Sequence, residues 1–367
     1  MPQTVAQNLT IQQILGWVYL TGIVEAIKTG IPDVLPPEFY TIKKDTLMDQ
    51  GRYTRVEGTR QTARRVNYGA PAIQRSLVNI GSYDVKLLHS YEFITLDVKT
   101  YQSLRAYDNY NVQNMGMQEI DRQALQFRAY FDNLEKACLY SMLGSGQIYF
   151  DSSGNLLPTS SGAALTVDYG LSSAHQNQLN GIISASWASP TTDIPTQIRY
   201  IQKQSAKDTG YVLENGFYGI NIPSYFAVNS FAQPFLARSP VMREKFLDTG
   251  EIPDGLFGVR KWVPVYTAFY SDANGNQQEF FNVDGITFTP AVDSVWYEMM
   301  VGTYPVPTSF QPMANLQAAV NSFEIVQGLF SYGIPVHNPM TAEVFYGHTF
   351  LPVCKFPDAM YIADTTP

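Results

Sequence analysis

The sequence predicts an α+β fold in which one long helix lies between two groups of strands. Apolar residues recur at steps of three and four over residues 117–143, which indicates the helix. Apolar and polar residues alternate over residues 83–93, which indicates a half-buried strand just before it. Late in the chain, residues 262–270 and 278–283 flank Asn274-Gly275, a pair typical of tight β-hairpin turns. Strands and helices in separate parts of a chain are typical of α+β proteins.

Composition limits the possible functions. The 367 residues include 24 Lys+Arg and 32 Asp+Glu, a net charge of −8, which argues against a dedicated nucleic-acid-binding protein. The 24 Tyr, 21 Phe and 4 Trp supply too much apolar surface for a disordered chain. Only 15% of residues are charged, against about 25% in a typical protein. We therefore expect copies of the chain to cover part of its exterior.

Residues 1–38 are predicted to form an N-terminal arm. Apolar residues over 11–27 are spaced as in an amphipathic helix, and polar residues interrupt them too often for a membrane span. The N-terminus shows no basic segment followed by an apolar run, so no secretory signal is expected. Pro36-Pro37 are predicted to impose an extended backbone just before Phe39.

Residues 39–82 are predicted to form a long two-stranded loop. The segment from Thr41 to Arg75 carries a net charge of +5, which leaves −13 for the rest of the chain. Six of its eight basic residues are arginine, which suits bidentate pairing with carboxylates on another protein surface. Contact with nucleic acid and a simple solvated hairpin are alternatives. We expect the loop to contact a neighbouring copy through six arginines: Arg52, Arg55, Arg60, Arg64, Arg65 and Arg75.

Residues 83–192 are predicted to form a unit built on the helix over 117–143, with Gly144 as its C-terminal cap. At 1.5 Å per residue this helix is about 40 Å long, which is unusual for a globular protein. Its carboxylates are the partners that we expect the arginines of a neighbouring copy to meet. These predicted interface acids are Glu119, Asp121, Asp132 and Glu135.

Residues 193–347 are predicted to form a further unit, with helices over 194–204 and within 223–247 followed by the late hairpin. In an alternative course, the part near 285–312 returns to the preceding unit. Residues 348–367 are predicted to form a C-terminal strand.

The sequence contains few signs of catalysis. None of the four histidines has a second ligand at metal-binding spacing, and neither a nucleophile elbow nor a phosphate-binding loop is present. Cys138 and Cys354 are predicted to be free thiols. The carboxylates Asp284, Asp293 and Glu298 lie near aromatic residues and would suit a glycan-processing protein. Their spacing does not distinguish them from ordinary acids, so we expect no enzyme, no cofactor and no metal.

Several short motifs occur in a characteristic order along nearly the whole chain. They are Gly30-Ile31-Pro32-Asp33, the stretch 51–80 with Gly69-Ala70-Pro71, Val167-Asp168-Tyr169-Gly170, Thr192-Asp193-Ile194 and Leu351-Pro352-Val353-Cys354. In this order the chain resembles the major capsid proteins of tailed bacteriophages, and among them the lambda-type major capsid protein E family. The resemblance implies the tailed-phage major capsid fold. Its parts would be an N-terminal arm, an extended β-hairpin loop (E-loop), a peripheral (P) domain with a long spine helix, and an axial (A) domain.

The resemblance also implies a function. Such a protein assembles as hexamers and pentamers into an icosahedral shell that encloses double-stranded DNA without binding it specifically, and the acidic body of this chain fits that role. The protein would be a virion component assembled in the host cytoplasm, with no membrane. Its partners would be other copies of itself and separate scaffolding, portal and decoration proteins. The alternatives are a glycan-binding or glycan-processing protein and another structural component of a virion.

Overall fold

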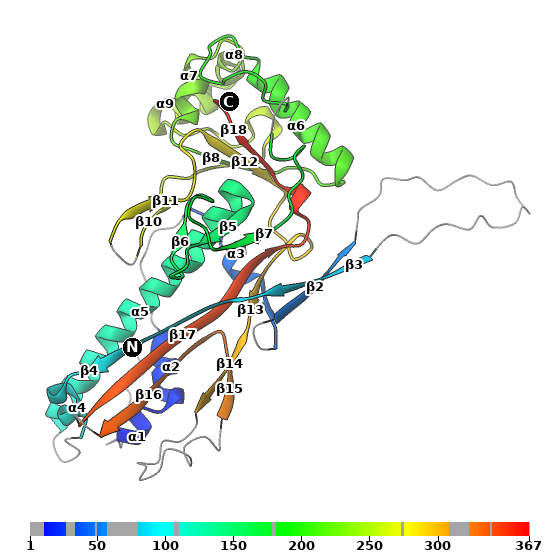
Figure 1. Ribbon diagram of the computed structural model, residues 1–367. Coiled ribbons are helices and arrows are strands. Elements are labelled where there is room, and N and C mark those ends of the chain that lie inside the picture. The colour runs from blue at the N-terminus through cyan, green and yellow to red at the C-terminus, as the bar shows by residue number, and fades with distance from the viewer. Residues whose placement is uncertain are drawn as a thin grey trace, which may run out of the picture.

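The computed structural model describes residues 11–26, 34–47, 50–56, 80–105, 110–177, 181–272, 275–307, 323–337 and 340–366. Figure 1 shows an elongated molecule in which a long helix and a long strand run side by side. A lobe rich in helices lies at one end of this spine, and a two-stranded ribbon projects from its side. The arrangement is α+β, as predicted.

The long helix is α5, which extends from Tyr110 to Ser145 and so begins before the predicted start. Its C-terminal cap is Gly146, which has a φ of 71° and whose N–H donates to the carbonyl of Met142 at 2.9 Å. The predicted cap, Gly144, lies two residues earlier, inside the helix. It is needed there for another reason, because a Cβ at this site would lie 2.8 Å from the carbonyl oxygen of Phe280.

The main sheet has five strands, and β17 (Met340–Cys354) is its central strand. On one side β17 pairs antiparallel with β4 (Leu88–Leu96). On the other side it pairs first with β16 (Leu329–His337) and then with β13 (Tyr297–Val301). The short strand β1 (Lys43–Asp45) adds to β13 in parallel. The predicted C-terminal strand therefore exists, but it begins at the start of β17 rather than at residue 348.

One face of this sheet packs against α5. Tyr346 stacks on Phe127 with ring centroids 4.3 Å apart, and Phe131 lies 6.0 Å from the ring of His348. Successive residues of a strand point to opposite faces, so the even-numbered residues of β17 form this contact. The same face is covered by two N-terminal helices, α1 (Ile11–Ile14) and α2 (Trp17–Ala26), and by α4 (Val98–Arg105).

The backbone before Phe39 differs from the prediction. Pro37 has φ −61° and ψ −19° and precedes the short helix α3 (Glu38–Thr41), so Pro36-Pro37 start a helix rather than impose an extended chain. Proline is well suited to a helix start, because its φ is already helical and the missing N–H has no partner there. The buried ring of Phe39 packs edge-on against Tyr297 at 4.9 Å.

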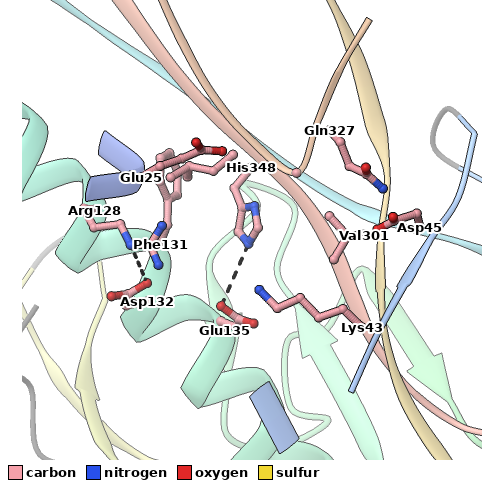
Figure 2. Close-up of a pocket in the computed structure, with 12 residues that line it drawn as sticks. Glu25, Lys43, Asp45, Arg128, Phe131, Asp132, Glu135, Val301, Gln327 and His348 are labelled. Atoms are coloured by element: carbon pink, nitrogen blue, oxygen red, sulfur yellow. Dashed lines mark ion pairs between the residues drawn. The ribbon is translucent and has the colours of Figure 1, made fainter. Parts of the chain in front are cut away.

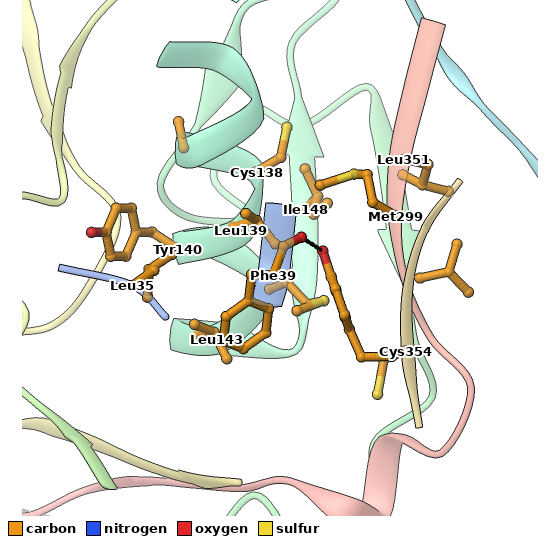
Figure 3. Packing of buried hydrophobic residues seen from close by; sticks show 14 of the residues in the cluster. Leu35, Phe39, Cys138, Leu139, Tyr140, Leu143, Ile148, Met299, Leu351 and Cys354 are labelled. Carbon is orange, nitrogen blue, oxygen red and sulfur yellow. Dashed lines mark hydrogen bonds between the residues drawn. The ribbon is translucent and has the colours of Figure 1, made fainter. Parts of the chain in front are cut away.

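Figure 3 shows the core that forms where the C-terminal half of α5 meets α3 and the main sheet. Leu139 and Leu143 of α5 pack there with Phe39. Cys138 and Cys354 belong to the same core and are buried free thiols, as predicted. Burial raises the pKa of the Cys138 thiol far above its usual range, so this sulfur is chemically inert in the folded protein.

The lobe at the end of the spine contains a four-stranded sheet and four helices. The strands, in order across the sheet, are β18 (Tyr361–Asp364), β12 (Gly285–Thr289), β8 (Asn215–Tyr218) and β9 (Lys261–Pro264). The helices are α6 (Ile194–Asp208), α7 (Ile222–Val228), α8 (Gln233–Arg238) and α9 (Pro240–Thr249). The predicted helical region 223–247 is thus divided into three helices, because the chain turns at Asn229 and Ser239. Asn229 stabilises the first turn by accepting hydrogen bonds from two backbone N–H groups.

Smaller strands complete the fold. They are β5 (Gln147–Phe150), β6 (Leu156–Leu157) and β7 (Leu165–Asp168), the hairpin β10 (Phe269–Ser271) with β11 (Gln277–Glu279), the pair β14 (Thr303–Pro307) with β15 (Phe323–Gln327), and the ribbon β2 (Gln50–Val56) with β3 (Ile80–Lys86). The late hairpin and the two-stranded base of the predicted loop are confirmed.

The contact between α5 and the main sheet predicts a large loss of stability for Phe131→Ala. Phe131 is 2% exposed, and truncation of a buried Phe costs about 3–5 kcal/mol. Leu125→Ala on the same helix is the matched control, because Leu125 is 47% exposed and should change stability by no more than about 0.5 kcal/mol. Urea denaturation measures both variants. Equal losses for the two would contradict this description of the spine.

Candidate functional site

The base of the predicted loop is the ribbon formed by β2 and β3. Tyr53 lies opposite Tyr83 in the ladder, and their rings stack 5.5 Å apart. Arg52 lies opposite Asp84, with 2.6 Å between Nε and Oδ1, and the guanidinium lowers the pKa of the Asp84 carboxyl. Both side chains are well exposed, so Arg52 is paired within its own chain yet faces solvent.

The other five arginines of the loop are placed only in part. Arg55 pairs with Gly81 through its backbone, and nothing further is described for it. Arg60, Arg64, Arg65 and Arg75 lie outside the described residues. Contact of the six arginines with a neighbouring copy therefore stays a prediction.

The predicted interface acids of α5 have neighbours on their own helix. Glu119 accepts hydrogen bonds from Arg122, and Asp132 lies 3.0 Å from Nε of Arg128. Asp121 is exposed to solvent. None of these contacts tests a role between copies, which stays a prediction for these three residues and for Glu135.

Glu135 lies in a cavity of about 390 Å³ between α5 and the main sheet (Figure 2). Its Oε2 is 4.0 Å from Nε2 of His348, which comes from β17. Lys43 of β1 extends into the same space, and Arg128 and Glu25 also line it. This cluster could not be predicted from the sequence, because its members are far apart along the chain and follow no motif.

Burial determines the charge state of this cluster. It lowers the pKa of His348 to about 3, and the nearby positive charges of Lys43 and Arg128 act in the same direction. Burial also raises the pKa of Glu135, although the charge of Lys43 partly offsets this effect. His348 is therefore neutral at ordinary pH, and its contact with Glu135 is not a full ion pair.

The second face of the main sheet is unusually aromatic. Phe345 of β17 lies between Tyr91 of β4, at 5.6 Å, and Tyr332 of β16, at 5.1 Å. The side chains toward the β4 edge are open to solvent, since Phe93 is 56% exposed and Tyr91 is 38% exposed. Contiguous exposed apolar surface of this kind is typical of a protein–protein contact.

Apolar side chains are also exposed on the lobe. Helix α9 buries none of its residues, and Val241 and Leu247 on it are 75% and 70% exposed. Val228 at the end of α7 is 55% exposed. Helix α9 therefore presents two apolar side chains to solvent among its charged residues, while its Phe246 packs partly against the core of the lobe.

The three carboxylates considered for glycan chemistry have structural roles. Asp284 accepts hydrogen bonds from Asn221 and Tyr225, and Asp293 accepts from two backbone N–H groups in its own turn. Glu298 is buried in β13 between two lysine side chains. The described residues therefore offer no pair of unengaged carboxylates among these three.

Two features are absent from the described part of the chain. It contains no group of three or more His, Cys, Asp or Glu side chains arranged to hold a metal ion. It also contains no helix with the length and apolar character needed to cross a membrane.

Comparison with known proteins identifies the fold. No family model and no curated protein matches the sequence. Among solved structures, the chain aligns with the "putative capsid protein of prophage (E.coli CFT073)" at a TM-score of 0.52 and 10% identity, over 95% of this chain and 99% of that one. A phage-related protein from Bordetella bronchiseptica RB50 aligns at a TM-score of 0.46 and 9% identity, over 96% and 97% of the two chains. A structure from Gordonia phage Cozz aligns at a TM-score of 0.43 and 10% identity, over 99% of this chain and 97% of that one.

The first of these alignments carries the assignment, because it alone among the three exceeds a TM-score of 0.5 and it includes nearly all of both chains. The predicted fold, that of the tailed-phage capsid proteins, is thereby confirmed. The narrower likeness to the lambda-type family stays a prediction.

The pKa of His348 predicts a dependence of stability on pH. Its folded pKa of about 3 lies below the ordinary value of 6.5, so the stability it contributes is complete above pH 6.5 and is lost as the pH falls. At pH 4.5 the loss is roughly 2–3 kcal/mol, at about 1.4 kcal/mol per pH unit. We expect His348→Gln to lose less stability than the parent protein between pH 7 and pH 4.5.

Denaturant unfolding at several pH values measures this difference. Glu135→Gln is the matched control with the opposite sign, because a raised folded pKa contributes stability at low pH that is lost as the pH rises. If His348→Gln and the parent protein lost the same stability between pH 7 and pH 4.5, His348 would not be the group that titrates.

Proposed function

We propose that this protein is the structural subunit of a phage capsid shell. The observation that carries the proposal is the shared fold over nearly the full length of a prophage capsid protein. An elongated subunit with a projecting ribbon also has the exposed apolar surfaces that a self-assembling protein needs, on the aromatic sheet face and on the lobe. The low charge content of the chain fits the same role, because surface that is covered by other copies does not need charge to stay soluble.

The proposal extends to the assembly. Copies of the chain would form hexamers and pentamers that close into an icosahedral shell, with double-stranded DNA enclosed and not specifically bound. The acidic body supports this point, since a surface of net negative charge repels phosphate. The protein would act without catalysis, as a virion component assembled in the host cytoplasm, with separate scaffolding, portal and decoration proteins as partners.

The domain limits of this proposal follow the sheets. We propose that the ribbon is the E-loop, that α5 with the five-stranded sheet is the P-domain, and that the four-stranded sheet with its helices is the A-domain. Residues 297–354 would then belong mostly to the P-domain, since β13, β16 and β17 pair within its sheet. The part of the chain that we assign to the P-domain here is therefore longer than the part near 285–312 considered from the sequence. The A-domain is correspondingly shorter than the predicted 193–347.

Expression of the full chain tests the function. We expect particles of uniform size by negative-stain electron microscopy, and a fast-sedimenting species in the ultracentrifuge, when a candidate scaffolding protein is co-expressed. A compact monomer under every condition, together with absence of this chain from purified virions of the phage that encodes it, would contradict the proposal.

The arginine-rich loop predicts a specific assembly defect. Reversal of Arg52, Arg55, Arg64 and Arg65 to Glu should abolish particle formation, because each change replaces attraction to an acidic neighbour by repulsion. The melting temperature of the unassembled chain should stay close to that of the parent, since exposed ion pairs contribute only about 0–1 kcal/mol each.

The matched control reverses four exposed cations of the lobe, Lys203, Lys207, Arg243 and Lys261. It changes the net charge by the same amount without touching the ribbon. Particles formed normally by the ribbon variant, or lost equally in both variants, would refute a specific role for the loop.

A further inference from the structure

A lysine of the main sheet contacts the base of the ribbon, whose second strand, β3, also leads through Leu87 into β4. Lys44 lies opposite Met300 in the parallel ladder of β1 and β13. Its Nζ is 3.3 Å from Oε1 of Glu298 on β13 and donates a hydrogen bond of 2.9 Å to the carbonyl oxygen of Arg52 on β2. A single ammonium group therefore connects the sheet to the first strand of the ribbon.

The carboxylate that holds Lys44 is itself fixed. Glu298 is 6% exposed, and its second oxygen, Oε2, lies 2.7 Å from Nζ of Lys355. Lys355 also donates to the carbonyl oxygen of Ser294. A buried carboxylate needs compensating charges and hydrogen bonds, so Glu298 cannot turn away to solvent without breaking its ion pair with Lys355. Lys44 is thus bound to a buried carboxylate of β13 that a second lysine also contacts.

A second contact brings the two strands together beside this lysine. A Cβ at Gly51 on β2 would lie 2.3 Å from Sδ of Met300 and 3.2 Å from Cγ1 of Val85. The absence of a side chain at Gly51 lets the backbone of β2 lie close to the thioether of the buried Met300. The ribbon is therefore held against the sheet by an apolar contact at Gly51 and by a polar bridge through Lys44.

We propose that Lys44, Glu298 and Gly51 form a pivot that sets the direction in which the ribbon leaves the sheet. They are positioning residues for the ribbon and need no second copy of the chain to act. At about 3.3 Å per residue, a rotation of about 10° at Gly51 moves the far end of β2, at Val56, by roughly 3 Å. Under the proposed function, this displacement decides whether the ribbon meets a neighbouring subunit.

The pivot is tested by a distance measurement in the unassembled protein. Spin labels at Ser82→Cys on β3 and Gln126→Cys on α5 report the angle between ribbon and spine, since both sites are exposed and the native cysteines are buried. Electron–electron double resonance should give one narrow distance distribution in the parent. Lys44→Met should broaden and shift that distribution, and Lys44→Arg, which keeps the charge and donors, should restore most of it.

Lys245→Met is the matched control. Lys245 is 47% exposed, close to the 41% of Lys44, and lies 3.9 Å from Asp254 in the lobe. It should leave the distance unchanged. Gly51→Ala should shift the distance by pushing β2 away from Met300, and Glu298→Gln should broaden it.

The outcomes separate the pivot from the proposed function. If Lys44→Met has the distance distribution of the parent, the pivot is refuted. This test does not depend on whether Glu298→Gln folds, because the Lys44 side chain is not buried and its replacement should leave the fold intact. If the distribution broadens, the pivot is supported. Particle formation is then measured on the same variant, and normal particles would count against the ribbon's role in assembly while leaving the pivot in place.

Discussion

The packing of α5 against β17 is the contact on which the rest of the structure depends. The helix has 36 residues and the strand 15, and at about 1.5 and 3.4 Å per residue each spans roughly 50 Å. The two elements are therefore of about equal length, and they are in contact at Tyr346 and His348 of the strand. Every other part is attached to this pair: β4, β16 and β13 through the ladder of β17, and the lobe through the C-terminal end of α5. Loss of the stacked pair Phe127 and Tyr346 would weaken the contact between α5 and β17 to which these parts are attached.

Periodicity predicted the elements that bury one face, and little beyond them. The spine helix follows from residues such as Ile120 and Phe127, which recur at helical spacing and are buried as expected. The earlier start of α5 and the three-way division of 223–247 could not be predicted, because they depend on tertiary contacts and on the turn chemistry of Asn229. The cavity around Glu135 and His348 could not be predicted from the sequence either. Its residues come from strands and helices that only the fold brings together.

The surfaces follow a similar division. The basic character of the loop could be predicted from its composition, because the charges of a segment can be counted without knowledge of the fold. The aromatic sheet face could not be predicted in this way. Its residues Tyr91, Tyr332 and Phe345 become neighbours only in the register of β4, β17 and β16. Glu298 is a different case: its aromatic neighbours in the sequence made it one of three carboxylates considered for the glycan alternative, and in space two lysines pair with it. Proximity in sequence to aromatic residues carries little information about the role of a carboxylate.

The order of strands in the main sheet also governs when the protein can fold during synthesis. β4 is made early, but its partner β17 is near the C-terminus, so the ladder between them closes a loop of more than two hundred residues. Helix α5 emerges from the ribosome long before the strand that covers it. The aromatic face cannot exist on a nascent chain, because it is built from strands at both ends of that loop. A growing chain therefore lacks this aromatic face until β16 and β17, which end at Cys354, have been made.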